Sequence, residues 1–379
     1  MKARLGDYIQ EYSVRNKADE DIPVYSVTNT QGFCRDYFGK EVASKDKSTY
    51  KVVPRGCFAY NPSRINVGSV DWQRNEEKVI VSPLYNVFSV SSELEQQYLY
   101  YYLKSDVALH FIKEVATGSV RDNLKFDMLC DFRLNLPSLG KQGHIVQILD
   151  KVKLLIQMKQ SELNKLDSLI KARFVEMFGD PVYNPKGWKK LQLQEIAMDD
   201  CSISYGIVQT GDDQEEGVPV FRPVDIVNKV PQLMELKKTT QEISNKYKRT
   251  ILMGREMLIT VRANIADTYI VGKEFAGCNV GRGIVPIRIK EHIMILEFLK
   301  YQIDSEHLND YIRKLAKGIT LVQLNMEDLR EIELIVPPLE QQRLFVEFAK
   351  QVDKSKVAVQ KALEETKLLF DSLMQEYFG

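Results

Sequence analysis

The chain has 379 residues, of which 44% are hydrophobic and 27% are charged, and this composition excludes a disordered chain, a collagen-like fibre and a disulfide-rich miniprotein. Its 52 basic and 52 acidic residues cancel, so any binding to nucleic acid must come from local basic surfaces. No apolar run has membrane-spanning length, the N-terminus lacks the apolar stretch of a signal peptide, and the five cysteines form no Cys-x-x-Cys pair, which together predict a cytoplasmic protein with free thiols.

The first predicted domain covers residues 1–136 and has mixed α/β character. Two short runs rich in β-branched and aromatic residues, 79–81 and 85–88, predict strands separated by a Ser-Pro turn. A helix near residues 93–114 is expected to close the domain.

A long helix with a linker is predicted over residues 137–186. Apolar residues recur at steps of three and four, and no proline occurs between Lys141 and Phe178, which predicts one helix about 55–60 Å long. The segment Gly179-Asp180-Pro181 is expected to end it. The predicted seam has coiled-coil spacing and consists of Ile145, Ile148, Val152, Leu155, Leu163, Leu166, Ile170 and Met177.

The second half of the chain repeats this plan at a constant spacing of 200 residues. Residues 136–142 (LPSLGKQ) correspond to 336–342 (VPPLEQQ), and 177–179 (MFG) correspond to 377–379 (YFG). A second mixed domain is predicted over 187–336, with strands at 257–261 and 283–289 and a helix near 291–317. A second long helix is predicted over 337–379, with a seam of Phe345, Phe348, Val352, Val359, Leu363, Phe370, Leu373 and Tyr377.

These elements predict an α+β fold that arose by internal duplication. A long helix with one apolar stripe must bury that stripe, and the second long helix is the simplest partner. The short linker favours an antiparallel pair. We therefore expect two mixed α/β domains separated by an antiparallel two-helix coiled coil and related by a pseudo-two-fold axis.

The paired segments resemble the specificity subunit of type I restriction–modification systems. Residues 136–139 and 167–181 resemble the central conserved region of that family, and residues 336–342 and 377–379 resemble its distal one. Residues 56–68, 81–85, 218–226 and 279–283 resemble recurrent patterns of its target recognition domains. The resemblance spans essentially the whole chain, although Gly140-Lys141 replaces the Glu-Gln of the second copy and Gly143 interrupts the first helix.

The resemblance implies a non-catalytic reader of double-stranded DNA. Each target recognition domain, 1–136 and 187–336, would read one half of a split, asymmetric site. The chain would dock two modification subunits, which use S-adenosylmethionine to methylate adenine, and restriction subunits that use ATP with Mg²⁺ could join them. The chain itself would hold no cofactor and no metal.

The sequence offers no catalytic constellation of its own. Tyr60-Asn61-Pro62-Ser63 lacks the second proline and the aromatic residue of an adenine methyltransferase motif, and it is interpreted as a turn. The four histidines have no Cys or His partner at metal-binding spacing. We therefore predict a binding protein with no catalytic residues.

Candidate DNA contacts are basic and amide side chains beside turns, because Lys and Arg bind phosphates while Arg, Asn and Gln read base edges. In each case a solvated loop or a structural turn is the alternative interpretation. The candidates in the first domain are Lys45, Lys47, Tyr60, Asn61, Arg64 and Asn66. Those in the second domain are Tyr205, Gln209, Arg222, Lys246, Lys248, Arg249, Arg262, Asn264 and Arg282.

Two alternatives to a type I specificity subunit stay open at the level of sequence. The first is the specificity chain of a related system whose partner fuses methylation and cleavage, and neighbouring genes or pull-down partners would distinguish it. The second is a coiled-coil scaffold that binds proteins through its globular domains. A scaffold predicts no DNA binding with any partner or at any salt concentration.

Overall fold

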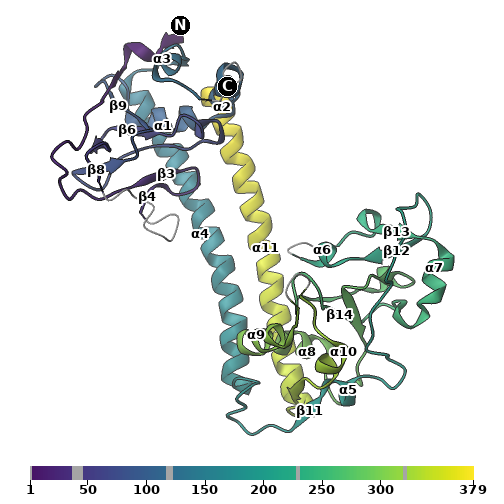
Figure 1. The fold of residues 1–379 in the computed structure, drawn as a ribbon. Helices are drawn as coiled ribbons and strands as arrows, with labels where there is room; N and C mark the ends of the chain where they lie inside the picture. The colour runs from purple at the N-terminus through teal and green to yellow at the C-terminus, as the bar shows by residue number, and fades with distance from the viewer. Residues whose placement is uncertain (1, 36–45, 117–122, 228–230, 319–321) are drawn as a thin grey trace. The chain divides into compact units, whose positions relative to one another are not determined.

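A computed structural model describes residues 2–35, 46–116, 123–227, 231–318 and 322–379 (Figure 1). The chain divides into two compact units. Unit 1 contains residues up to Ser161 together with Val359–Gly379, and unit 2 contains Glu162–Ala358. The two long helices, α4 (Leu139–Phe178) and α11 (Leu339–Phe378), each contribute one part to each unit. Each compact unit therefore includes segments of both long helices.

Unit 1 is built around a four-stranded antiparallel sheet of order β2-β9-β6-β7. Its central strand β6 is buried on both faces, because the sheet lies between the closing helices and a second small core. The strands are β1 (Lys2–Arg4), β2 (Ile9–Glu11), β3 (Ser26–Thr28), β4 (Gly32–Cys34), β5 (Lys51–Pro54), β6 (Phe58–Tyr60), β7 (Val70–Trp72), β8 (Lys78–Val81), β9 (Asn86–Val90) and β10 (Arg133–Asn135). The helices are η1 (Leu5–Asp7), η2 (Ile65–Val67), α1 (Gln96–Lys104), α2 (Asp106–Ala116) and α3 (Phe126–Cys130).

Unit 2 has two three-stranded sheets, of order β13-β12-β16 and β15-β14-β17, and one two-stranded pair, β11-β18. Strands β12 and β16 run parallel, and every other pair in these sheets is antiparallel. The strands are β11 (Lys190–Gln192), β12 (Val218–Phe221), β13 (Lys237–Thr239), β14 (Met257–Thr260), β15 (Thr268–Ile270), β16 (Asn279–Val280), β17 (Ile284–Ile287) and β18 (Glu333–Ile335). The helices are α5 (Leu193–Ile196), α6 (Pro223–Ile226), η3 (Leu233–Glu235), α7 (Gln241–Lys246), η4 (Lys248–Thr250), η5 (Lys273–Phe275), α8 (Leu296–Ile303), α9 (Glu306–Leu315) and α10 (Met326–Arg330).

The two long helices run antiparallel within each unit, as predicted. In unit 1 the first turns of α4, with Ile145 and Leu149, share a core with Leu373 and Phe378 at the end of α11. In unit 2 the end of α4 packs on the beginning of α11, where the rings of Phe174 and Phe345 meet edge to face at 5.4 Å. One residue of the predicted seam is wrong: Leu155 is exposed, whereas Leu149, which the predicted seam does not contain, is fully buried.

The C-terminal end of α4 follows ordinary capping chemistry. Gly179 adopts a φ of +76°, which glycine accepts without steric cost, and its N–H donates to the Val175 carbonyl at 2.8 Å. The Trp188 indole N–H donates to the last helical carbonyl, that of Phe178, at 2.9 Å. Pro181 cannot continue the helix. Glycine and proline therefore end this helix at the predicted position.

The internal duplication is visible in a pair of buried glutamines. Gln142 accepts from the Glu95 N–H at 2.8 Å and donates to the carbonyls of Glu93 and Pro137 at 2.9 Å. Gln342 accepts from the Ile295 N–H at 2.9 Å and donates to the carbonyls of Ile293 and Pro337 at 3.2 and 2.7 Å. Both side chains are fully buried. Each copy thus fastens the start of its long helix to the segment before its closing helices by the same three bonds.

The predicted strands are confirmed to within two residues at each end, but each predicted closing helix is in fact two helices. A serine interrupts the helical backbone in both copies. Ser105 is extended, and its hydroxyl donates to the Tyr102 carbonyl at 2.7 Å and accepts from the Ala108 N–H at 3.3 Å. Ser305 repeats the first contact with the Gln302 carbonyl at 2.6 Å. Such local side-chain bonds compete with the helical ladder, which explains the break.

Candidate nucleic-acid interface

In unit 2 the fold brings four predicted segments together. The loop with Tyr205 and Gln209 runs beside the turn at residues 281–283, because Ile207 forms a parallel bridge with Gly281. A side chain at Gly206 would collide with the Val280 carbonyl, so only glycine permits this approach. A side chain at Gly283 would meet Pro223, which follows Arg222, and would lie 3.6 Å from the Cβ of Arg262.

A hydrogen-bond network fixes two of these candidates through a residue that the sequence did not single out. The Arg262 Nε donates to the Gln323 side-chain oxygen at 2.7 Å, and the Gln323 amide donates to the Tyr205 hydroxyl. That hydroxyl donates in turn to the Leu324 carbonyl at 3.2 Å. Gln323 orients both side chains. No local pattern could have identified it, since its partners lie 61 and 118 residues away.

Arg222 has a structural partner of its own. Its guanidinium donates to both carboxylate oxygens of Asp225, at 3.0 and 2.9 Å, and these hydrogen bonds raise the pKa of Arg222. Asp225 also accepts from the Arg222 N–H at 2.8 Å and so caps α6. This pairing uses the Nε and Nη2 donors of Arg222, and a DNA contact of this residue stays a prediction.

Gln209, Asn264 and Arg282 are exposed, and no hydrogen bond of their side chains occurs within the described parts of the chain. Asn264 lies in a turn in which Ala263 and Ala266 adopt φ values of +59° and +67°. Non-glycine residues rarely adopt this region, and strained turns cluster at binding sites. The turn lines a hollow of about 550 Å³ together with Asp267 and Arg313.

The basic cluster Lys246, Lys248 and Arg249 is attached to the same surface through Asn279. This buried amide donates to the Ser244 hydroxyl at 3.1 Å and accepts from the Thr250 hydroxyl at 2.7 Å, which holds α7 and η4 on strand β16. Lys246 pairs with Glu242 at 2.9 Å. Lys248 and Arg249 are exposed and, within the described residues, form no ion pair.

The structure places the candidates of the first domain in different environments. The prediction that Tyr60 contacts DNA is wrong, because its side chain is fully buried. Its hydroxyl donates to the Leu124 carbonyl at 3.2 Å and accepts from Asn86 at 2.9 Å. It is a core residue and leaves the candidate set. Lys45 lies outside the described residues, and Lys47 is 3.8 Å from the Asp21 carboxylate.

The turn after β6 keeps the remaining candidates of the first domain together. Asn61 accepts from the N–H and the hydroxyl of Ser63, at 3.1 and 2.9 Å, which closes the predicted turn. Arg64 is exposed at the start of η2. The side-chain oxygen of Asn66 is buried and has no hydrogen-bond partner within the described residues. A buried acceptor of this kind calls for a donor.

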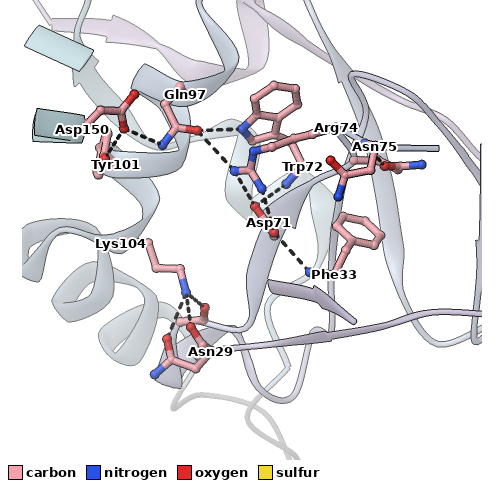
Figure 2. Close-up of polar contacts among 12 residues, drawn as sticks. Asn29, Phe33, Asp71, Trp72, Arg74, Asn75, Gln97, Tyr101, Lys104 and Asp150 are labelled. Carbon is pink, nitrogen blue, oxygen red and sulfur yellow. Dashed lines mark hydrogen bonds and ion pairs between the residues drawn. The ribbon is translucent and has the colours of Figure 1, made fainter. Parts of the chain in front are cut away.

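A further polar cluster in unit 1 was not predicted (Figure 2). Asp71, with only 5% of its side chain exposed, accepts from the Phe33 N–H at 3.1 Å and pairs with Arg74 at 2.9 Å. Gln97 accepts from Arg74 at 3.2 Å and donates to Asp150 on α4 at 3.5 Å. The β3–β4 hairpin, strand β7 and helix α4 are therefore connected by one chain of polar contacts.

The described residues contain no group of three or more His, Cys, Asp and Glu side chains that could hold a metal ion. In the same part of the chain, no helix combines the length and the apolar character needed to cross a bilayer.

Residues 6–168 and 185–366 match the family model described as type I restriction modification DNA specificity domain. The chain is 24% identical over 294 residues to the EcoBI type I restriction enzyme specificity subunit of Escherichia coli, covering 70% of this chain and 60% of that protein. It is 24% identical over 382 residues to the MjaVIII type I restriction enzyme specificity subunit of Methanocaldococcus jannaschii, covering 92% of this chain and 85% of that protein. The chain thus spans about 60% of the length of the E. coli relative.

Two solved structures share the fold at low sequence identity. A chain from work on complex assembly and conformational transition of the type I R-M system has a TM-score of 0.63 and 18% identity, with 100% of this chain and 97% of that chain covered. The S subunit of the type I restriction–modification system from M. genitalium has a TM-score of 0.52 and 12% identity, with 100% of this chain and 96% of that chain covered.

The predicted duplication and resemblance are confirmed, because both halves match the same family model. The chain belongs to the family of type I restriction–modification DNA specificity proteins.

Proposed function

We propose that the chain is the DNA sequence-specificity subunit of a cytoplasmic type I restriction–modification complex. It reads a bipartite, asymmetric site in double-stranded DNA, with one half-site for each target recognition domain, and it docks two modification subunits. Those partners carry S-adenosylmethionine and methylate adenine, and restriction subunits join them with ATP and Mg²⁺. The chain contributes recognition and no catalytic group.

The observation that supports this proposal is that the long helices and the elements next to them recur in both halves of the chain, whereas the sheets of the two domains differ. Several features recur at a spacing of 200 residues. They are the buried glutamines Gln142 and Gln342, the helix interruptions at Ser105 and Ser305, and the element pairs α3/α10, β10/β18 and α4/α11. Between them, unit 1 has a sheet of order β2-β9-β6-β7 and unit 2 has β13-β12-β16 and β15-β14-β17. Two dissimilar domains attached in the same way to equivalent helices suit a DNA site whose two halves differ in sequence.

The exposed polar side chains are our candidates for DNA contacts. Gln209, Asn264 and Arg282 are assigned to base edges, with Arg262 and Tyr205 held by Gln323 beside them. Lys248 and Arg249 are assigned to phosphates. In the first domain Arg64, Asn61 and Asn66 are assigned to recognition and Lys47 to the backbone.

Exposed apolar side chains on the long helices support docking of a protein partner. In the unit 1 part of α4, Leu154, Leu155 and Met158 have exposed fractions of 55%, 46% and 59%. In the unit 2 part of α11, Val357 is 71% exposed and Leu344 is 56% exposed. Large apolar side chains grouped on a helix surface mark interaction sites more often than isolated ones do.

Methylome sequencing tests the proposal directly. Cells that carry this chain with its neighbouring modification subunit are compared with cells that lack only this chain. We expect a methyl-adenine motif of two short halves around an unspecified gap, and we expect deletion of the chain to abolish it. If the reconstituted complex binds the modification subunit but shows no sequence preference, the proposal is wrong.

A further inference from the structure

Three cations surround one aromatic ring in unit 1. The ring of Tyr100 lies 5.4 Å from the Arg74 guanidinium, 5.6 Å from the Lys104 ammonium and 5.3 Å from the Lys153 ammonium. These cations come from the segment after β7, from the end of α1 and from α4. Like charges so close together repel one another unless anions share the site.

The two nearby carboxylates do not satisfy this excess. Asp71 is 5% exposed, and its oxygens accept from Phe33, Trp72 and Arg74. Asp150 accepts from the Tyr101 hydroxyl at 2.5 Å and from Gln97 at 3.5 Å. Three cations against two occupied carboxylates leave one positive charge uncompensated.

Lys104 contributes positive charge to the site, but its ammonium has no N–H group left to bind a ligand. Its three N–H groups are taken by the Asn29 carbonyl at 3.0 Å, the Asn29 side-chain oxygen at 2.9 Å and the Gly68 carbonyl (Figure 2). The pKa of Lys104 is lowered to about 8, mainly by burial; Asp71 opposes this shift, and the positive charge of Lys153 adds to it. An added anion would relieve this penalty.

Hydrogen-bond donors line the space in front of the ring. A hollow of about 450 Å³ is bordered by Thr30, Gln31, Lys153 and Gln157, together with the cation of Arg74 and the carboxylates of Asp71 and Asp150. Lys153 and Gln157 are one turn apart on α4 and so face the same way. Within the described residues Lys153 forms no ion pair, and its ammonium lies over the Tyr100 ring.

We propose that this hollow binds a backbone phosphate of the DNA, with the Lys153 ammonium as its direct ligand. Arg74 and Lys104 supply the positive field behind it, and Gln157 and Thr30 donate hydrogen bonds from the rim. The proposal rests on the proposed function, because the phosphate belongs to the duplex that the subunit reads. The contact carries no base information and positions the first recognition domain on the duplex.

The second copy lacks this site, which makes the contact one-sided. At a spacing of 200 residues, Tyr100, Lys104 and Lys153 correspond to Lys300, Asp304 and Asp353. Lys300 pairs with Asp304, and Asp353 accepts from the Tyr301 hydroxyl at 2.9 Å. The acidic residues that replace Lys104 and Lys153 would repel a phosphate, so only the first recognition domain carries the contact.

The test is the salt dependence of DNA binding by the complex of the full chain with its modification subunits. The probe is a duplex carrying the methylated motif, and the variants are Lys153→Gln and its matched control Lys151→Gln, an exposed lysine of the same helix. Loss of one phosphate contact reduces the slope of log K against log salt by about 0.9. We expect this reduction for K153Q, no change for K151Q, and an unchanged motif for both.

A second arm identifies the phosphate. Single methylphosphonates are placed in turn along the duplex, and one position should weaken the wild-type complex while leaving K153Q unaffected. Equal slopes for wild type and K153Q would overturn the inference and leave the proposed function standing. A smaller slope for K153Q without any such position would also overturn it, because Lys153 would then act only through its field. Absence of sequence preference in the wild type would instead reject the proposed function, and K153Q would still decide the phosphate contact on any duplex.

Discussion

At the residue scale, Gln142 and Gln342 show how one side chain holds a helix to its domain. Each uses three of its hydrogen-bonding positions on backbone groups, and each is fully buried. Because their partners are main-chain atoms, these bonds do not depend on which side chains occupy the neighbouring positions.

Replacing Gln142 with alanine should therefore be costly. The change leaves the Glu95 N–H and the carbonyls of Glu93 and Pro137 without their partner in a buried site. Unsatisfied buried groups cost about 1–3 kcal/mol each, and partial entry of water makes about 2–4 kcal/mol a reasonable total. Urea unfolding of the full chain measures it, with Gln147→Ala as the control, since Gln147 is exposed on the same helix. Equal midpoints for the two variants would contradict this role of Gln142.

Single residues were also the hardest feature to predict from the sequence. Tyr60 lies beside a turn typical of binding loops, yet β6 is buried on both faces, which alternation along three residues cannot reveal. The side-chain hydrogen bonds of Gln323, Arg74 and Lys104 go to partners at least 23 residues away, apart from the Arg74–Asp71 pair. Such roles arise from tertiary packing, so they cannot be predicted from local sequence patterns.

At the element scale, the long helices and the predicted strands agree with the structure to within two residues, whereas the division of each closing helix into two was not predicted. A pattern of apolar residues over forty positions outweighs local noise, so α4 and α11 were recognisable. The closing helices keep the same periodicity across Ser105 and Ser305, so their breaks were missed. A serine that caps one helix and begins the next has no periodic signature.

One element junction in unit 2 should respond to pH. After α4, Asp180 accepts from the N–H groups of Val182 and Tyr183, at 2.9 and 3.1 Å, and pairs with His307 of α9. The Tyr183 ring packs against the imidazole at 5.5 Å. The charged groups that face His307 are Asp180, Glu306 and Asp310, and the hydrogen bond with Asp180 is the main reason why the pKa of His307 is raised.

The sign follows from the raised pKa. A histidine that holds its proton more tightly in the folded state stabilises the fold fully below its unfolded pKa of about 6.5, and this stabilisation is lost as the pH rises through the folded value. The lowered pKa of Asp180 keeps its carboxylate charged throughout that window. The melting temperature of the full chain should therefore fall more steeply as the pH rises above about 6.5 in the wild type than in His307→Gln. His292→Gln, at an exposed turn position, is the control and should retain the wild-type slope. A wild-type slope in His307→Gln would show that the pair contributes nothing to stability.

At the scale of the whole molecule, the repeated long helices are separate from the segment that lies between them in the chain. In unit 2 the segment between the long helices begins at β11 and ends at β18, and these two strands pair with each other through residues 190–192 and 333–335. The second recognition domain is thus closed by its own first and last strands. Two kinds of contact link it to α11. The N–H of Ile295 and the carbonyl of Ile293 bond Gln342, and the side chains of α8 pack on α11, where the rings of Phe298 and Phe345 meet edge to face.

This arrangement predicts that residues 187–336 can be exchanged as one piece. A corresponding segment from another family member brings its own β11–β18 pair and offers the same backbone groups to Gln342. The long helices need no adjustment where its closing helix keeps the aromatic contact with Phe345. We expect methylome sequencing of cells with the exchanged chain to show a motif in which one half is new while the other half and the gap are unchanged. Exchange of residues 1–136 is the reciprocal control and should alter the opposite half. A change in both halves after either exchange would mean that the two domains read DNA jointly, because the determinants of each half-site would then be shared between the copies.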